Sequence, residues 1–205
     1  MRPAAPRSLV EGAHAVLGRP LEDAERQAFD KYLHLLCKWQ RVQRLVGSTD
    51  PEWIVENLLL DSLLFLRVLP ERVRSVADLG SGAGLPGIPI RIVRPDLAVT
   101  LIESRQGRVS FLSTVIRELA LAGTKVVNAR AEEVAAESPR SFDAVLVRCA
   151  GEIERIHPIA SRLVSPGGVV IVSGPPVSRP LQHGEWVDVP GFRPGHTRRF
   201  AVFGA

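Results

Sequence analysis

The sequence predicts an α/β protein in which a helical N-terminal extension precedes a doubly wound, mostly parallel sheet of seven strands. Short apolar runs alternate with helical segments after Pro70, which is the pattern of strands buried on both faces. Before Pro70 the apolar residues have helical spacing instead. A glycine-rich segment follows the first apolar run, where open α/β sheets bind their ligands. We therefore expect a helical extension over residues 1–70 and a sheet domain over residues 71–205.

The extension is predicted to contain two helices. Between residues 21 and 46 the apolar side chains recur three to four positions apart, as on one face of a helix. A second helix should begin at Pro51, because Asp50 is a suitable N-cap and proline suits the first helical position. The apolar residues between Ile54 and Leu66 are dense, so we expect this helix to pack tightly on the sheet domain.

The sheet domain is predicted from five apolar runs that are separated by helices. The runs are residues 75–79, 99–102, 125–128, 143–147 and 169–172, and the helices are residues 85–93, 107–121, 131–137 and 152–163. Two further strands, 185–189 and 199–203, flank a segment rich in glycine and proline. These last strands are expected to form an antiparallel hairpin at the end of the parallel sheet.

Composition and cysteine use narrow the class of protein. The chain has 205 residues and is 45% hydrophobic, enough to bury a core without disulfides. Its cysteines, Cys37 and Cys149, match no zinc spacing, which indicates a reducing compartment and no metal. The N-terminus does not have the apolar core of a signal peptide, and the longest apolar stretch, 58–69, is too short and polar to span a bilayer. We expect a cytoplasmic monomer that binds no membrane.

The charge balance favours a polyanionic partner. The net charge is +4 and the isoelectric point is about 9.7, which suits an interaction with RNA. Most of the basic residues are arginine, however, so a general preference for arginine over lysine explains the charge almost equally well.

The strongest signal is the glycine-rich segment from Asp78 to Gly87, between the first strand and its helix. Its glycines, Gly80, Gly82 and Gly84, allow a tight turn and a close approach to a ligand. The following helix N-terminus offers free N–H groups to an anion. Asp78 could hold the backbone of the loop or face a positively charged group of the ligand.

Two cofactors compete for this loop. Residues 82–87 match the dinucleotide fingerprint Gly-x-Gly-x-x-Gly, but the match begins two residues after the strand ends. Counted from Asp78, the pattern Asp-x-Gly-x-Gly-x-Gly is the form usual in S-adenosylmethionine enzymes, and the chain has no room for the substrate domain of a nicotinamide enzyme. We therefore favour S-adenosylmethionine over a dinucleotide or a purely structural turn. Glu103, about 20 residues further on, can accept hydrogen bonds from the ribose hydroxyls; capping of the next helix is the alternative.

Five stretches of the chain carry a resemblance to a known family. They are residues 59–62, 78–89, 92–95 and 108–112, and residues 129–133 with Phe142, Asp143 and Arg148 beyond. Together they resemble the small-subunit ribosomal RNA guanine-N7 methyltransferases, the RsmG or GidB family, over roughly Gln27 to Gly174. The resemblance implies a Rossmann-like class I methyltransferase fold with a helical N-terminal extension, which agrees with the pattern above.

The resemblance also implies the residues of the site. The cofactor contacts that it implies are Gly80, Leu85, Glu103, Ala131, Glu132 and Arg148, to which the loop adds Asp78, Gly82 and Gly84. Ala131 and Glu132 would hold the adenine, although Glu132 could instead serve the start of a helix. Arg108, Arg130 and Arg148 would contact the RNA, and ordinary surface salt bridges are the alternative for each.

The implied reaction needs little acid–base machinery. Guanine N7 is an exposed lone pair on the major-groove edge of the base, and it can attack the methyl group without first losing a proton. Catalysis then depends on alignment of the reactants, so no catalytic residue is assigned. The target base is expected to be turned out of its stack. The expected partner is ribosomal RNA or the small ribosomal subunit.

The chain departs from the family on the substrate side. Gly107 and Ser173 stand where the family has lysines, and Leu58 stands where it has a histidine. Arg105 and Arg179 could replace the missing charges. Otherwise the protein would be a cofactor-binding paralogue, a sensor or a ribosome-binding protein, with another substrate or without turnover. Cys149 raises a cytosine-C5 mechanism through a thiol nucleophile, but Arg148 precedes it in place of the proline that usually positions such a cysteine, so a partly buried structural thiol is favoured.

Overall fold

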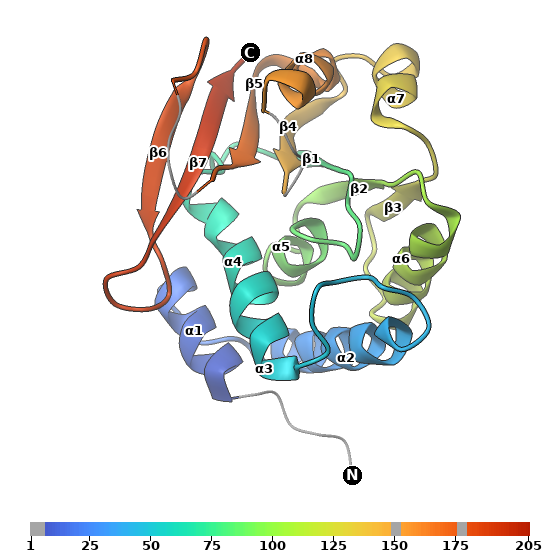
Figure 1. Cartoon of the computed structure of the whole chain (residues 1–205), viewed down its shortest axis with the longest axis vertical. Coiled ribbons are helices and arrows are strands. Elements are labelled where there is room, and N and C mark those ends of the chain that lie inside the picture. The colour runs from blue at the N-terminus through green and yellow to red at the C-terminus, as the bar shows by residue number, and fades with distance from the viewer. Residues whose placement is uncertain (1–6, 149–152, 176–179) are drawn as a thin grey trace.

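A seven-stranded sheet forms the centre of the molecule, in a computed structural model that describes residues 7–148, 153–175 and 180–205 (Figure 1). Its strands are β1 (Ser75–Leu79), β2 (Ala98–Ile102), β3 (Thr124–Val127), β4 (Phe142–Val147), β5 (Val164–Ser173), β6 (Glu185–Pro190) and β7 (Thr197–Gly204). The strand order is β3-β2-β1-β4-β5-β7-β6. Strands β1 to β5 are parallel, and β7 runs antiparallel to both β5 and β6. The predicted fold class and the C-terminal hairpin are confirmed.

Four helices connect the parallel strands and cover both faces of the sheet. They are α5 (Gly87–Val93), α6 (Gln106–Glu118), α7 (Ala131–Glu137) and α8 (Ile153–Leu163). Residues of α5 and α6 pack in one hydrophobic cluster, and residues of α7 and α8 pack in a second one. The sheet is therefore doubly wound, and its strand order reverses between β1 and β4. Ligands of such sheets bind at this reversal, outside the carboxyl ends of the strands.

The chain before the sheet is helical, with one more helix than the sequence predicted. Helix α2 (Asp23–Gln40) is followed by a continuous helical stretch made of α3 (Pro51–Ile54), a π-helical turn (Val55–Leu59), α4 (Leu60–Leu63) and a 3₁₀ turn (Leu64–Arg67). Asp50 caps this stretch by accepting a hydrogen bond from the N–H of Glu52 at 3.1 Å, as predicted. The additional helix is α1 (Arg7–Leu17), which buries Leu9, Ala13 and Val16.

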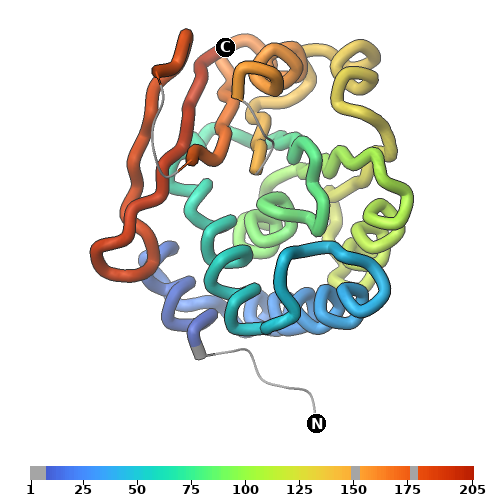
Figure 2. Tube along the Cα trace, viewed as in Figure 1, coloured from blue at the N-terminus to red at the C-terminus, as the bar shows by residue number. Residues whose placement is uncertain are grey.

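Helix α2 is shorter than its apolar pattern predicted, because a side chain replaces the helical hydrogen bonds after Gln40. The amide oxygen of Gln40 accepts from the N–H groups of Leu45 and Val46, at 2.7 and 3.0 Å, and its NH₂ group donates to the carbonyl of Val46 at 2.7 Å. Residues 41–46 therefore belong to a loop that arches from the end of α2 back to α3 (Figure 2).

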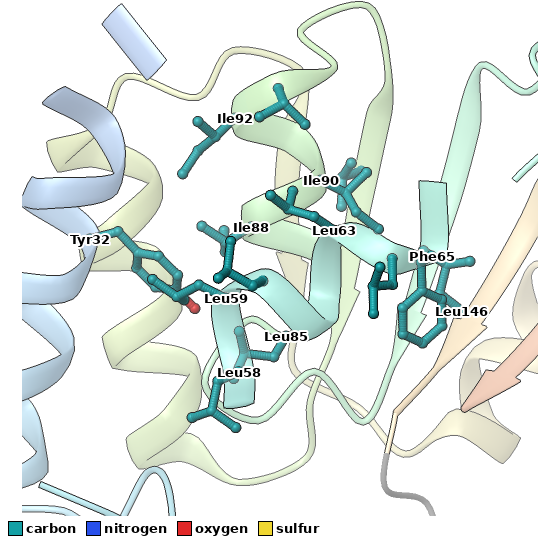
Figure 3. Packing of buried hydrophobic residues seen from close by; sticks show 14 of the residues in the cluster. Tyr32, Leu58, Leu59, Leu63, Phe65, Leu85, Ile88, Ile90, Ile92 and Leu146 are labelled. Atoms are coloured by element: carbon teal, nitrogen blue, oxygen red, sulfur yellow. The ribbon is translucent and has the colours of Figure 1, made fainter. Parts of the chain in front are cut away.

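The helical extension and the sheet share one hydrophobic core. Side chains of the extension, such as Tyr32, Leu59 and Leu63, pack against Ile88 and Ile90 of α5 (Figure 3). All five are fully buried, and burial of a side chain of this size contributes about 1.5–3 kcal/mol. The extension is thereby held against α5, the helix that follows the glycine-rich loop.

Candidate functional site

The glycine-rich loop leaves β1 at the point where the strand order reverses. Gly80, Gly82 and Gly84 have φ angles of +70°, +59° and +90°. Residues other than glycine adopt such positive φ angles only at a cost in free energy. The N–H groups of Gly80 and Ser81 donate to the carbonyl of Ile102 at 2.9 and 3.0 Å. The loop is therefore tied to the carboxyl end of β2, and its glycines are required by its backbone conformation.

Asp78 performs one of its two predicted roles and is placed for the other. Its Oδ2 accepts a hydrogen bond from the N–H of Gly87 at 2.8 Å, which fixes the start of α5 to the end of β1. A Cβ atom at Gly87 would lie 2.7 Å from that oxygen, so only glycine fits there. The other oxygen, Oδ1, is buried and has no hydrogen-bond partner. Burial raises the pKa of Asp78 to about 7, and a cationic ligand group would both satisfy Oδ1 and favour the ionised form.

Glu103 directly follows β2 and binds the glycine-rich loop through its carboxylate. Its Oε2 accepts from the N–H of Gly82 at 2.9 Å, and its Oε1 accepts from the N–H of Arg105 at 2.8 Å. Nη1 of Arg108 lies 3.7 Å from the same Oε2. Each carboxylate oxygen keeps a second lone pair, so the side chain can still accept hydrogen bonds from ribose hydroxyls. Arg108, which is predicted to contact the RNA, thus lies beside the acid that is predicted to bind the cofactor.

The predicted adenine contacts lie at the start of α7. Ala131 is half-buried, and Glu132 and Arg130 are exposed. Glu133 caps the helix, because its Oε2 accepts from the N–H of Arg130 at 2.9 Å. Glu132 also lies in the first turn of α7, so both of its predicted roles, an adenine contact and a negative charge at the helix start, stay predictions.

Arg148 directly follows β4 and faces the helical extension. Its Nε lies 3.2 Å from Oδ2 of Asp61, and its Nη2 donates to the carbonyl of Asn57 at 2.9 Å. Nε of Arg198, on β7, lies 2.9 Å from the other oxygen of Asp61. Leu79 of β1 pairs with Val147 of β4. The backbone of Arg148, the next residue, therefore lies beside the glycine-rich loop. The residue thus ties the end of the β4 segment to the extension, and Asp61 of the extension also pairs with Arg198 of the C-terminal hairpin.

Three residues of this region were missed from the sequence. Tyr32 donates its buried hydroxyl to the carbonyl of Ala83 at 2.6 Å and so holds the loop from α2. Asn128 donates to the carbonyls of Glu103 and Ser104, at 3.1 and 3.2 Å, and joins the ends of β2 and β3. Asp61 binds two arginines. Tyr32 is the single tyrosine of the chain and stands in an apolar helix face, which was its only signal.

The positions that depart from the family have new neighbours. A Cβ atom at Gly107 would lie 2.8 Å from Oε1 of Gln43, so the loop after α2 occupies the space beside Gly107. At the second position, Ser173 ends β5 and pairs with Phe200 of β7. Leu58 is buried in the π-helical turn. Arg105 is exposed at the N-cap of α6, whereas Arg179 and Cys149 lie outside the described residues.

The described residues show neither a metal site nor a membrane-spanning helix. No group of three or more His, Cys, Asp or Glu side chains in this part of the chain is arranged to hold a metal ion. None of its helices is long and apolar enough to cross a membrane. A cavity of about 960 Å³ lies away from the loop, between α2 and α6, so size alone does not identify the functional site.

Comparisons with known proteins agree on one family. The model of the GidB family, described as rRNA small subunit methyltransferase G, matches residues 25–174. A ribosomal RNA small subunit methyltransferase G of Stutzerimonas stutzeri is 39% identical over 146 residues, which are 71% of this chain and 66% of that protein. The protein of the same name from Sorangium cellulosum is 37% identical over 177 residues, 84% of this chain and 74% of its own length.

A solved structure supports the fold alone. A SAM-dependent methyltransferase from Aquifex aeolicus superimposes with a TM-score of 0.54 at 16% identity, over 76% of this chain and 93% of that one.

The extent of the family match, which covers the glycine-rich loop, Glu103 and Arg148, decides the assignment: the chain belongs to the GidB family of small-subunit rRNA methyltransferases.

Proposed function

We propose that the protein transfers the methyl group of S-adenosylmethionine to N7 of a guanine in small-subunit (16S) ribosomal RNA. The observation that carries this proposal is the pair of acids on either side of the glycine-rich loop. Asp78 has a buried oxygen without a partner, and Glu103 closes the loop at the strand-order reversal. Family membership supplies the class of acceptor.

The residues present fit the cofactor. Its methionine ammonium would face Oδ1 of Asp78, its ribose hydroxyls would donate to Glu103, and its adenine would lie at Ala131 and Glu132. The space between these groups of the cofactor would be lined by the backbone of Gly80, Gly82, Gly84 and Leu85. Bound there, the cofactor supplies an electrophilic methyl group on a sulfonium.

The acceptor chemistry assigns alignment, rather than proton transfer, to the protein. Methyl transfer would form a bond between guanine N7 and the methyl carbon at the expense of the carbon–sulfur bond of S-adenosylmethionine, and the positive charge would pass from sulfur to the guanine ring. No proton is released in this step, so the chain needs no general base. Arg108, Arg130 and Arg148 are proposed to hold the RNA in line with the methyl group.

A second candidate is a cofactor-binding paralogue that does not methylate this RNA. The observation that favours it is Gly107, because Gln43 occupies the space beside this position where the family resemblance expects a lysine. We nevertheless prefer the enzyme, since Arg108 remains beside Glu103 and Arg198 donates to the carbonyl of Gly174, next to Ser173. We also propose that the protein acts as a monomer in the cytoplasm, where ribosomal subunits are its substrate.

The deciding experiment uses labelled S-adenosylmethionine. The protein is incubated with small ribosomal subunits, and with their free RNA, from a strain that does not have the N7 methylation, and modified guanines are mapped at base resolution. Label at a single guanine N7, absent with the variant Glu103→Ala, is the expected result. Tight cofactor binding with no label in either RNA would reject the enzyme in favour of the paralogue.

A further inference from the structure

A pocket of about 360 Å³ opens beside Arg148, where two distant parts of the chain meet. One wall is the helical stretch that contains Asn57 and Asp61. The other wall is the turn between β6 and β7, with Phe192 and Arg193, together with Arg198 at the start of β7. Figure 1 shows this turn beside the helical extension. The volume is in the range of small-ligand sites.

The pocket carries an excess of positive charge. Arg148 and Arg198 share Asp61, and Arg193 forms an ion pair with Glu56. Three guanidinium groups therefore face two carboxylates, and His196 also lines the pocket. The guanidinium of Arg193 lies over the ring of Phe192, 5.3 Å from its centre, and its side chain remains 48% exposed. Since a guanidinium has five N–H donors, one carboxylate partner leaves donors of Arg193 available to a ligand.

The position of the pocket relates it to the methyl donor. Arg148 forms part of the wall of this pocket. It also directly follows β4, and so it lies next to the end of β1 and the glycine-rich loop. A group held in the pocket would thus lie across Arg148 from the proposed cofactor site.

Arg198 also lies where the chain departs from its family. Nη1 of Arg198 donates to the carbonyl of Gly174 at 3.0 Å, next to Ser173, the position of one missing lysine. The family match ends at residue 174, so Arg193 and Arg198 belong to a part of the chain that the match does not reach. The C-terminal hairpin brings a cation to the place where the family resemblance expects one from β5.

We propose that this pocket binds a backbone phosphate of the RNA strand that carries the acceptor guanine, with Arg193 and Arg198 as its ligands. The inference rests on the proposed function for the identity of the RNA. Arginine suits this role because its planar group donates to two phosphate oxygens at once. The alternative is a purely structural one, in which the arginines only clip the hairpin to the extension.

Neighbouring arginines of β7 provide a matched control. Arg199 follows Arg198, and successive side chains of a strand point to opposite faces. It pairs with Asp188 of β6 through two hydrogen bonds of 2.6 Å and does not line the pocket. The test compares Arg193→Gln, Arg198→Gln and Arg198→Lys with Arg199→Gln. Binding of a small-subunit RNA fragment is measured across a series of salt concentrations, together with cofactor affinity and thermal unfolding.

The expected result is specific to charge in the pocket. Arg193→Gln and Arg198→Gln should each weaken RNA binding about 10-fold and reduce the slope of log affinity against log salt by about one. Arg198→Lys should keep the slope, and Arg199→Gln should resemble the unmodified protein. Cofactor affinity should stay the same in all four variants, which would exclude general unfolding.

Other outcomes separate this inference from the proposed function. If Arg193→Gln and Arg198→Gln retain the salt slope of Arg199→Gln while RNA is still methylated, the pocket proposal is wrong and the enzyme proposal stands. If the unmodified protein binds RNA with the predicted dependence on Arg193 and Arg198 but transfers no methyl group, the reverse holds. If it binds neither the RNA fragment nor the small ribosomal subunit, both are rejected.

Discussion

At the scale of single residues, the two oxygens of Asp78 have different surroundings, and the difference has a consequence for pH. Oδ2 is bound by the N–H of Gly87, whereas Oδ1 has no partner. Burial raises the pKa of Asp78 from the ordinary 3.8 to about 7. In the ligand-free protein the acid is therefore protonated at slightly acidic pH, and a cofactor ammonium must bind to the ionised form.

We predict that cofactor affinity falls as the pH is lowered through 7. Below this pKa each unit of pH should cost up to about 10-fold in affinity, because binding must first remove the proton. Asp78→Asn should bind more weakly and lose this dependence. Calorimetric titration between pH 5.5 and 8.5 provides the measurement, with Asp96→Asn, an exposed acid near the opposite end of β2, as control. An unchanged pH profile in Asp78→Asn would contradict the assignment.

The same group links folding to pH in the opposite direction. The folded-state pKa of about 7 lies above the ordinary 3.8 of the unfolded chain. The stabilisation from protonated Asp78 is thus complete below about pH 3.8 and is lost as the pH rises to about 7. Above neutral pH, Asp78 should therefore no longer stabilise the fold of the ligand-free protein. Bound cofactor should restore the stability that is lost when Asp78 ionises.

The loop glycines should differ in their sensitivity to substitution. Gly80 and Gly84 both have positive φ angles, but a Cβ at Gly80 meets open space, whereas at Gly84 it would lie 2.5 Å from Cγ1 of Ile88. Gly80→Ala should cost about 1–2 kcal/mol of stability from backbone strain. Gly84→Ala should cost about 1–3 kcal/mol more from overpacking. Urea unfolding of the two variants measures the difference, and equal losses would show that α5 moves to accommodate the methyl group.

Sequence reasoning reached the residues of this site whose role depends on local pattern. Asp78, Glu103 and the glycines lie at strand ends, and a strand end can be located from apolar runs. Tyr32 and Asp61 are different, since their partners lie 51 and 87 positions away, at Ala83 and Arg148. No spacing rule indicates such contacts, which exist only because the extension folds back over α5.

At the scale of elements, the parallel strands were the most predictable part, because continuous apolar runs report burial on both faces. The extension was less so. Helix α1 begins in a segment with few apolar residues, and it is fixed by close packing of Gly12 on Leu60, where a Cβ would come within 2.3 Å of a leucine methyl group. The end of α2 depends on the side chain of Gln40, and apolar periodicity carries no information on such a substitute hydrogen bond.

Gln40 is predicted to control the loop that follows α2. Gln40→Ala removes three hydrogen bonds to Leu45 and Val46, each worth about 0.5–1.5 kcal/mol. The amides of both residues should then exchange with solvent about 10-fold faster or more, while amides of the sheet stay protected. Hydrogen exchange of the intact protein measures this. Gln27→Ala, an exposed glutamine of the same helix, should leave the loop unchanged; similar exchange in both variants would refute the role of Gln40.

At the scale of the whole molecule, the helical extension and the C-terminal hairpin meet beside Arg148. The extension supplies Tyr32 and Asp61, the sheet supplies the loop and Arg148, and the C-terminal hairpin supplies Arg198. Because the extension and α5 share one core, we propose that residues 1–70 and 71–205, although distinct in pattern, unfold in one cooperative transition. The sequence indicated each part, but their junction depends on three-dimensional contacts between side chains far apart in the chain.

Asp61 tests this junction, since it holds Arg148 and Arg198 with separate oxygens and is only 17% exposed. Asp61→Asn should lower stability by about 1–2 kcal/mol, because two guanidinium groups lose their shared counter-charge in a partly buried place. The same change makes the neighbouring pocket more positive, so RNA affinity at low salt should rise several-fold. Unfolding in urea and RNA binding, measured on one preparation, should therefore move in opposite directions. If both decrease, Asp61 acts by shaping the pocket, and the excess charge of the three arginines does not attract the RNA.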